Sequence, residues 1–314
     1  MVKLAKRKVM NDILINKLKE MRDVEKAAKQ PFKVRAYNIV IKQLETYELP
    51  IYSLQDVDAA KFTGIGTGIK TKLEEIFKTG TIKLVEDKRT LMQAVRDLST
   101  VHGIGAVKAN ELVKKHGITT VEQLADHKDL LNDVQLKGLK YHGDLQKRIP
   151  RDEMDKHLAY LKKHISTDFE IAGSYRRGAA DSGDIDMIMR ECDISPSCYE
   201  QAVRDLTKSK YIVDILAYGD HKFMGICKLP RHKTFRRIDI MIMDATRYPF
   251  ALLYFTGSQD HNIWMRNKAL GQGYSLNEYG LSKGKKLVDM KDSIKTENDI
   301  YKFLKLEYIE PINR

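Results

Sequence analysis

The sequence contains few cysteines and no long apolar run. Its three cysteines, Cys192, Cys198 and Cys227, form no CxxC pair and have no neighbouring pair of histidines. This spacing excludes the common zinc motifs and a disulfide framework, and it favours a reducing intracellular compartment. No transmembrane helix is expected. The N-terminus, MVKLAKRKVM, lacks the apolar segment of a signal peptide, and its basic residues suit a solvated tail or a nuclear-import patch.

Acidic residues are outnumbered by basic ones. The 314 residues include 55 Lys and Arg against 43 Asp and Glu, which gives a formal net charge of +12. Residues 1–90 alone hold 19 basic and 12 acidic residues. A basic excess favours a polyanionic partner such as nucleic acid, although a solvated surface gives the same composition. The length allows about two to four domains.

The spacing of apolar residues changes near residue 150. Before it, the spacing predicts two helices within 11–48, with Pro31 at the break, and a third over 68–78 that ends at Gly80. After it, a helix is expected over 151–165, short strands around 169–172, 185–189, 211–217, 223–229 and 237–243, and helices around 259–270 and 297–305. Such a mixture predicts an α+β layer.

Two segments share a Gly-Ile-Gly turn that opens into a helix, at residues 62–73 and 101–112. They are similar to helix-hairpin-helix motifs. Gly64, Gly66, Gly103 and Gly105 allow the backbone to approach a ligand closely, with amide groups turned outward at a helix N-terminus. This geometry suits a DNA phosphate, or a monovalent cation that bridges a phosphate to the loop, and it carries no base code. One such turn is commonly structural, but a pair in a basic chain favours DNA binding.

Three aspartates lie on strands that are expected to be buried. Asp184 and Asp186 are two residues apart and therefore point to one face, and Asp239 lies on a second strand, 236–243. Burying them unpaired would cost several kcal/mol each. The nearby arginines could form a salt-bridge network. We favour two Mg²⁺ ions, with Mn²⁺ able to substitute, which would clamp the reacting oxygens of a phosphoryl displacement.

A glycine and a serine, Gly173 and Ser174, precede the Asp-x-Asp pair in the manner of a nucleotidyltransferase palm. Ser174, Ser182 and Gly183 can offer hydroxyl and backbone donors to phosphate oxygens, and Arg177 adds a fixed charge. The pattern predicts a reaction class. It does not identify the substrate, because polymerases, poly(A)- and CCA-adding enzymes and small-molecule nucleotidyltransferases share it.

The chain resembles the X family of DNA polymerases, and its beta-type members most, over nearly its full length. The matching segments are GIGTGIKTKLEEIFKTG (64–80), VHGIGAVKANELVKKHGI (101–118), LKGLKYHGDLQKRIPRDEM (136–154), GSYRRGAADSGDIDMIM (173–189), KFMGIC (222–227), RRIDI (236–240), YFTGSQDHNIWMRNKAL (254–270) and NEYGL (277–281). The resemblance implies an α+β multidomain fold. The expected parts are an all-α lyase-type domain with the first helix-hairpin-helix motif (1–86), a DNA-binding helical subdomain with the second (87–149), a nucleotidyltransferase palm with a mixed sheet (150–246) and a small nucleotide-selection subdomain (247–314).

The resemblance also implies roles for single residues. Asp184 and Asp186 would hold both metals, and Asp239 would hold the catalytic one and help to deprotonate the primer 3′-hydroxyl. The triphosphate would be held by Arg148, Ser174, Arg177, Ser182 and Gly183. The sugar and base of the nucleotide would meet Tyr254, Phe255, the Gly257 turn and Asn262, and the DNA would contact Arg237 and Arg266.

A 5′-deoxyribose-phosphate lyase is implied as well. Lys72 stands at the position of the Schiff-base nucleophile, and Lys33 and Tyr37 stand at positions that bind a 5′-phosphate. A lysine attacks an aldehyde only as the neutral amine, which crowding by Lys33 and Lys70 would favour.

The chain departs from the family's pattern at several positions. Gly68 and Leu84 stand where beta-type members usually have lysines, and Phe32 replaces a histidine. Met241 replaces an arginine that takes part in opening and closing, and Ile263 replaces a basic residue near the template base. These departures bear on the lyase, on fidelity and on closure, and they leave the reaction class unchanged.

The resemblance therefore implies a DNA polymerase that fills short gaps in base excision repair by two-metal transfer from a dNTP to the primer 3′-hydroxyl, with lyase activity. Expected partners are gapped or nicked double-stranded DNA, dNTP, and DNA ligase or other repair proteins. A monomer is expected, nuclear in a eukaryote and cytoplasmic in a virus or bacterium. One alternative is a template-independent nucleotidyltransferase, against which Asn262 and Arg266 argue. Another is a non-catalytic DNA-end-binding scaffold, against which the three aspartates argue.

Overall fold

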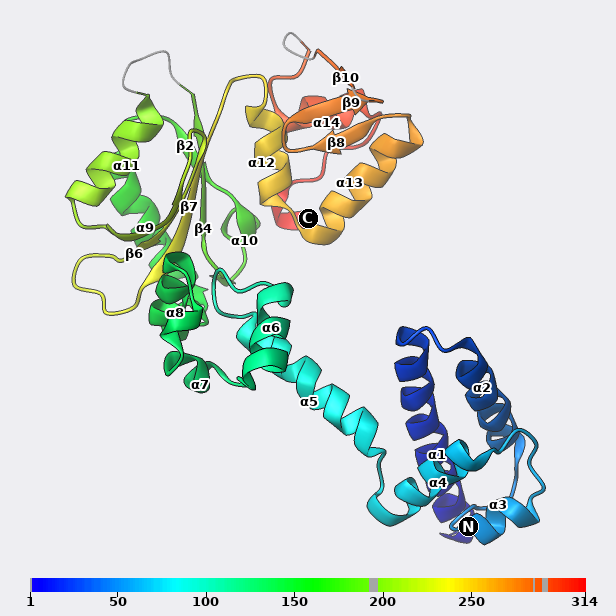
Figure 1. Cartoon of the computed structure of the whole chain (residues 1–314). Coiled ribbons are helices and arrows are strands. Elements are labelled where there is room, and N and C mark those ends of the chain that lie inside the picture. Colours follow the sequence, from blue (N-terminus) through cyan, green and yellow to red (C-terminus); the bar gives the residue numbers. More distant parts are fainter. Residues whose placement is uncertain (1, 192–196, 285, 290–292) are drawn as a thin grey trace. The chain divides into compact units, whose positions relative to one another are not determined.

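The computed structural model of the protein describes residues 2–191, 197–284, 286–289 and 293–314 (Figure 1). The chain forms two compact units, one made of Met1–Ser99 and Gly105–Leu124, the other of Thr100–Ile104 and Ala125–Arg314. Within the described residues, no helix has both the length and the apolar character needed to cross a membrane.

The first unit is helical. Its elements are α1 (Val2–Ala27), α2 (Pro31–Thr46), α3 (Leu54–Ala59), α4 (Thr67–Thr79), α5 (Lys83–Leu98), α6 (Ala106–His116) and most of α7 (Val121–Ala125). The predicted pair of helices within 11–48 is confirmed, and Pro31 lies in the first turn of α2. The predicted end of α4 is also confirmed, because Gly80 adopts the left-handed conformation, with φ 75°.

The core of this unit lies where α1, α2 and α4 meet. Leu14 and Leu18 of α1, Val40 of α2 and Leu73 and Ile76 of α4 are almost completely buried. Each contributes about 1.5–3 kcal/mol of burial free energy by the usual area relation. The packing fixes which face of α2 points inward and which is left to solvent.

The second unit is built around a mixed five-stranded sheet. In spatial order its strands are β2 (Phe169–Ile171), β4 (Ile185–Arg190), β7 (Arg236–Met243), β6 (Lys222–Cys227) and β5 (Ile212–Tyr218). Strands β4 and β7 are parallel, and the other neighbours are antiparallel. All five predicted strands are confirmed, with small shifts at their ends.

Two helices, α9 (Arg151–His164) and α11 (Cys198–Lys208), cover one face of this sheet (Figure 1). Leu161 of α9 and Leu206 of α11 are buried in one cluster with Ile185 and Met187 of β4. Because side chains alternate along a strand, Asp186 between them points to the opposite face. The sheet thus separates its apolar core from its carboxylates.

The rest of the second unit is made of shorter elements. They are α8 (Asp133–Leu145), β1 (Ile149–Pro150), α10 (Gly173–Arg176), β3 (Asp181–Ser182), α12 (Tyr248–Thr256), α13 (Gln259–Gly271), β8 (Ser275–Asn277), β9 (Gly280–Lys283), β10 (Lys286–Leu287), α14 (Glu297–Phe303) and the 3₁₀ turns Lys128–Leu130 and Pro311–Asn313. Strands β8 to β10 form a small antiparallel sheet. A helical N-terminal part followed by a mixed sheet confirms the predicted α+β multidomain class.

The cysteines differ from the expectation. Cys198 is disulfide-bonded, whereas Cys227 is a free thiol whose complete burial raises its pKa to about 12. Cys192 lies outside the described residues. The spacing of the cysteines predicted no disulfide framework, and it did not reveal the single bond at Cys198, because spacing in the sequence does not fix which cysteines the fold brings together.

Candidate active site and nucleic-acid interface

The three aspartates come together on the sheet face opposite α9 and α11. The parallel register of β4 and β7 places Asp186 directly beside Asp239. Asp184, just before β4, accepts a hydrogen bond from the guanidinium of Arg237. The Nε atom of Arg237 also lies 3.3 Å from Oδ1 of Asp239, and Nζ of Lys222 lies 3.5 Å from Oδ2 of Asp239. One carboxylate cluster therefore includes all three predicted residues and two cations.

The negative charge of this cluster is only partly compensated. Burial, with added repulsion from Asp184 and Asp239, raises the pKa of Asp186 to about 7. Burial also raises the pKa of Asp239, whose Oδ1 atom accepts no hydrogen bond. In the described part of the chain, no three His, Cys, Asp or Glu side chains are arranged to hold a metal ion. Arg237 already contacts two of the carboxylates, but the oxygen donors and the remaining charge fit a divalent cation.

Gly173 is required by the position of Asp186. Its φ of +58° lies in the left-handed region, and a Cβ atom there would lie 2.9 Å from Oδ2 of Asp186. Any side chain would therefore displace this carboxylate. The same glycine begins α10, which joins the carboxylate cluster to the predicted phosphate-binding residues.

The predicted phosphate-binding residues meet between α10 and the β1–β3 pair. Ser174 donates a hydrogen bond of 2.9 Å to the hydroxyl of Ser182. Arg148 contacts Oδ1 of Asp181 through Nε and Nη2, at 2.9 and 2.7 Å. A Cβ atom on Gly183 would lie 3.1 Å from the same guanidinium. The pairing of Ile149 with Ser182 produces this arrangement, so the structure brings four of the five residues into one group.

Arg177, the fifth, contacts the predicted nucleotide-selection residues. Its guanidinium donates a hydrogen bond to the carbonyl oxygen of Thr256 and lies 3.2 Å from the place of a Cβ atom on Gly257, where φ is +66°. The Gly257–Ser258 peptide bond is cis. Asn262 donates a hydrogen bond of 2.7 Å to the carbonyl oxygen of Tyr254.

The aromatic residues of α12 complete this group. The rings of Tyr254 and Phe255 meet edge to face at 5.0 Å, and the guanidinium carbon of Arg266 lies 5.1 Å from the centre of the Tyr254 ring. All the predicted nucleotide-selection residues, together with Arg266, therefore lie at the junction of α12 and α13.

Sequence reasoning missed an ion-pair chain behind α10. Arg176 donates a hydrogen bond of 2.8 Å to the Thr256 hydroxyl and pairs with Glu297 at 2.6 Å. The other oxygen of Glu297 pairs with Arg314 at 2.6 Å, and both side chains are almost completely buried. This series of ion pairs anchors the α10 turn to the C-terminal helices. No sequence signal points to it, because Arg176 and Glu297 are 121 residues apart.

The predicted lyase residues are held by carboxylates. Lys72 pairs with Glu75 at 2.9 Å, and Lys33 pairs with the buried Glu25 at 3.2 Å. Tyr37 is 5% exposed, and burial, assisted by the charge of Glu25, raises its pKa to about 12. The structure thus places most of the Tyr37 side chain in the helical core.

Lys70, which was expected to crowd Lys72, pairs with Asp58 at 2.7 Å. Each of the three lysines on which the lyase hypothesis depends therefore has an acidic partner. Phe32, which stands in place of the histidine, is 88% exposed.

The two Gly-Ile-Gly turns have the predicted local geometry. Gly64 and Gly103 have φ of 79° and 85°, and Gly66 and Gly105 are the N-caps of α4 and α6 without a side-chain cap. No atom lies within 4 Å of the place of a Cβ on Gly66 or Gly105. Each helix therefore begins with open backbone amides.

The raised pKa of Asp186 makes stability depend on pH. Between the ordinary value of 3.8 and about 7, the folded protein binds more protons at this carboxyl than the unfolded chain. The free energy of unfolding of the metal-free protein should therefore fall as pH rises through this window, by a few kcal/mol at most. Asp186→Asn should flatten that fall, which urea unfolding in EDTA at a series of pH values measures. If Asp186→Asn leaves the dependence of the free energy of unfolding on pH unchanged, Asp186 is not the group that causes it.

Comparisons with known proteins are consistent with this geometry. Four family models match the chain in sequence order. They describe a helix-hairpin-helix domain (residues 10–82), the fingers domain of DNA polymerase lambda (96–146), the DNA polymerase beta palm (148–245) and the DNA polymerase beta thumb (251–314).

Three curated relatives match most of the chain. DNA polymerase lambda of Rattus norvegicus is 27% identical over 308 residues, which cover 88% of this chain and 52% of the relative. DNA polymerase lambda of Arabidopsis thaliana is 29% identical, covering 83% and 54%. The DNA polymerase type-X family protein pol4 of Schizosaccharomyces pombe is 25% identical, covering 97% and 64%. The chain therefore spans about half the length of the first two relatives.

Proposed function

We propose that this chain, which has the domain set of the X family of DNA polymerases, fills short gaps in DNA during base excision repair. It would transfer a nucleotide from a dNTP to a primer 3′-hydroxyl on gapped or nicked double-stranded DNA. The observation that carries the proposal is the placement of Asp186 beside Asp239 on β4 and β7. The Ser174–Ser182 contact lies in the segment that leads into β4. Buried carboxylates with uncompensated charge, next to phosphate-binding donors, suit nucleotidyl transfer.

The carboxylates would hold two divalent metal ions, Mg²⁺ or Mn²⁺ in its place. Asp184 and Asp186 would contact both, and Asp239 would contact one. When bound, the ions would neutralise charge on the triphosphate and on the reacting oxygens.

The side chains of the protein would do the rest. The Oδ1 atom of Asp239, which accepts no hydrogen bond, would accept the proton of the primer hydroxyl, and the raised pKa of this carboxyl makes it a stronger base. The hydroxyls of Ser174 and Ser182 and the amide of Gly183 would donate hydrogen bonds to phosphate oxygens. Arg148 and Arg177 would release Asp181 and the Thr256 carbonyl oxygen, respectively, and bind the phosphates with their positive charges.

Nucleotide selection would take place at the α12–α13 junction. Tyr254, Phe255 and the Gly257 turn would pack against the sugar, and Asn262 would contact the base. Arg266 and Arg237 would contact DNA. The hydrogen bond from Asn262 to the Tyr254 carbonyl supports this, because it couples the base contact to the sugar contact.

We extend the proposal to the N-terminal region. The open amides of the Gly-Ile-Gly turns would bind DNA phosphates, with a monovalent cation as a bridge, and Lys72 would serve a 5′-deoxyribose-phosphate lyase with Lys33. We propose the same four domains as the sequence analysis: a lyase-type domain (1–86), a DNA-binding subdomain (87–149), a palm (150–246) and a nucleotide-selection subdomain (247–314). DNA ligase or other repair proteins as partners, a monomeric state and an intracellular location, nuclear in a eukaryote, belong to the same proposal.

Template use separates this function from template-independent transfer. We expect extension of a primer facing a short gap to exceed extension of the same single-stranded primer by about 10²-fold or more, because a positioned template aligns the reacting groups. Incorporation of each dNTP opposite each template base measures this. Equal extension of both substrates, without base preference, would favour the template-independent alternative. If no nucleotide is incorporated with either Mg²⁺ or Mn²⁺, the remaining alternative is a non-catalytic scaffold that binds DNA ends.

A further inference from the structure

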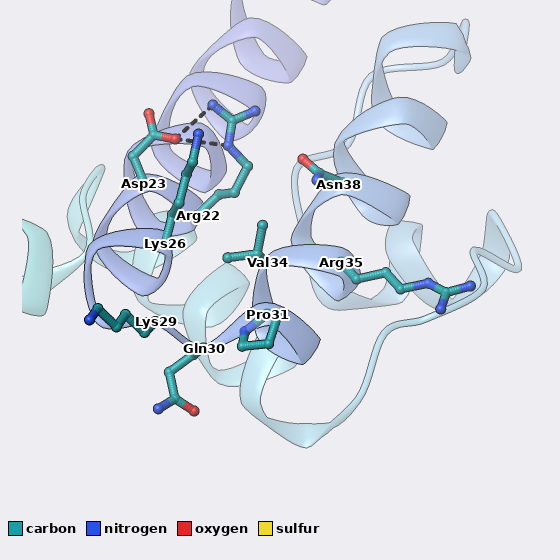
Figure 2. Close-up of a pocket in the computed structure, with 9 residues that line it drawn as sticks. All are labelled: Arg22, Asp23, Lys26, Lys29, Gln30, Pro31, Val34, Arg35 and Asn38. Carbon is teal, nitrogen blue, oxygen red and sulfur yellow. Dashed lines mark hydrogen bonds and ion pairs between the residues drawn. The ribbon is translucent and has the colours of Figure 1, made fainter.

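Polar side chains fix the geometry of a site best where they are buried, because an exposed side chain can exchange its partner for water. In the pocket where α1 ends and α2 begins, Lys26 and Arg35 are of the exposed kind (Figure 2). A polar cluster of the buried kind lies in the second unit, where α13 meets α14. It is centred on His261, which is 7% exposed.

His261 stands where the core-facing side of α13 begins. Met265 and Ala269 follow it at intervals of four residues, and both are buried in one apolar cluster with residues of α14. These three positions therefore share one face of the helix. Asn262 and Arg266 are each the next residue along the chain, so they lie about 100° further round the helix. The way in which His261 is held thus sets the direction of both neighbours.

The partner of His261 is Tyr301 of α14. Nε2 of His261 lies 2.7 Å from the Tyr301 hydroxyl, and Tyr301 is completely buried. Burial lowers the pKa of His261 to about 4 and raises the pKa of Tyr301 to about 12, so both side chains are neutral near pH 7. A hydrogen bond between two helices has a preferred direction and length, whereas two apolar rings at the same place can slide past each other.

This hydrogen-bonded pair adjoins the series of ion pairs behind α10. The guanidinium carbon of Arg314 lies 5.6 Å from the centre of the Tyr301 ring, and the charge of Arg314 adds to the lowering of the pKa of His261. Glu297, one turn before Tyr301 on α14, joins Arg314 to Arg176 of α10. Helix α14 therefore connects the first turn of α13 to the turn that bears the predicted phosphate-binding residues.

The buried histidine costs stability. In the described part of the chain, Nδ1 of His261 and Nη2 of Arg314 are buried and have no hydrogen-bond partner. A buried polar atom without a partner is destabilising, and an apolar ring in place of the histidine would remove the first of these two atoms. Proteins retain such a cost chiefly where the geometry that it secures serves a function. Packing alone therefore does not account for a histidine at this position.

We propose that His261 is a positioning residue for nucleotide selection. Its hydrogen bond to Tyr301 fixes the rotation of α13 about its own axis, and with it the direction of Asn262 and Arg266. The inference rests on the proposed function, in which Asn262 contacts the incoming base and Arg266 contacts DNA. It adds a group that touches neither substrate, and it assigns the accuracy of base selection to a contact between two helices.

A double-mutant cycle separates positioning from stability. For His261→Phe, Tyr301→Phe and the double variant, we would measure the midpoint of thermal unfolding and the ratio of kcat/KM for correct and incorrect dNTP on gapped DNA. Each single change leaves a buried polar group without its partner, so the midpoint should fall. The ratio should fall by about tenfold or more, because a small misplacement of the contacting groups is costly. In the double variant the two apolar rings pack together, so the midpoint should recover while the ratio stays low.

The palm contains a matched control. His157 of α9 is 1% exposed, and its Nδ1 lies 2.6 Å from the hydroxyl of Tyr211. Its other ring nitrogen has no hydrogen-bond partner in the described part of the chain, and burial lowers its pKa to about 4. This pair lies in the core on the helix-covered face of the sheet. His157→Phe and Tyr211→Phe should therefore lower the midpoint in the same way and leave the ratio as in the wild type.

Three outcomes would overturn the inference. If the double variant of His261 and Tyr301 regains the ratio together with the midpoint, the pair serves packing alone. If the control variants lower the ratio as much, the loss comes from general destabilisation. Unchanged ratios in active His261 variants would defeat the inference and leave the proposed function standing. A wild type that incorporates no nucleotide would instead defeat the proposed function, and the role of His261 in selection with it. The double variant decides the question if the single variants do not fold.

Discussion

Asp239→Asn should lower the rate of correct dNTP incorporation on gapped DNA by at least about 10³-fold, because it removes a charge from the point where the reacting oxygens would meet. The same change should raise the stability of the metal-free protein at neutral pH. Burial raises the pKa of Asp239 despite Arg237 and Lys222, so the ionised carboxylate is less well accommodated than a neutral group of the same shape. Single-turnover kinetics and thermal unfolding in EDTA measure the two effects.

A matched control for this variant lies on the edge strand of the same sheet. Asp214 of β5 pairs with Lys137 at 3.1 Å. Burial alone would raise the pKa of Asp214, but the hydrogen bond and the positive charge of Lys137 outweigh this effect, and the pKa is lowered. Asp214→Asn should therefore reduce stability and leave incorporation unchanged, the reverse of Asp239→Asn. Near-normal incorporation by Asp239→Asn would remove this residue from the catalytic site.

Lys72→Ala should reduce borohydride trapping of the protein on 5′-deoxyribose-phosphate DNA by at least about tenfold, because the Schiff base needs this amine. Its ion pair with Glu75 at 2.9 Å adds a second expectation. The amine must leave this ion pair before it can attack the sugar. Glu75→Gln should therefore increase the rate of trapping at neutral pH, which quenched-flow sampling and gel electrophoresis would measure.

Lys70→Ala is the control for this experiment, since Lys70 is on the same helix and pairs with Asp58 instead. It should trap as the wild type does. Equal trapping by Lys72→Ala and the wild type would assign the adduct to another lysine. A loss of trapping in all three variants would indicate damage to the helix and not to a nucleophile.

The sequence by itself determined most of the secondary structure, and it singled out three aspartates that the structure brings together. Apolar spacing gave α1, α2 and the five strands, because periods of 3.6 and 2 follow directly from local backbone geometry. The alternation along β4 placed Asp186 opposite Ile185 and Met187 before any contact was known. The Gly-Ile-Gly turns were predictable for the same reason, since a positive φ at Gly64 and Gly103 is a local requirement. The predicted resemblance to the X family is confirmed by the four family models.

Only the tertiary structure decided which charges meet. The contact of Arg237 with Asp184 and the bridge from Arg176 through Glu297 to Arg314 join residues distant in the sequence. The pairing of Lys33 with Glu25 depends on the packing of α2 against α1. An ion pair depends on distance and desolvation, which the packing of the whole chain sets, whereas a helix or a strand is already specified by the residues within it.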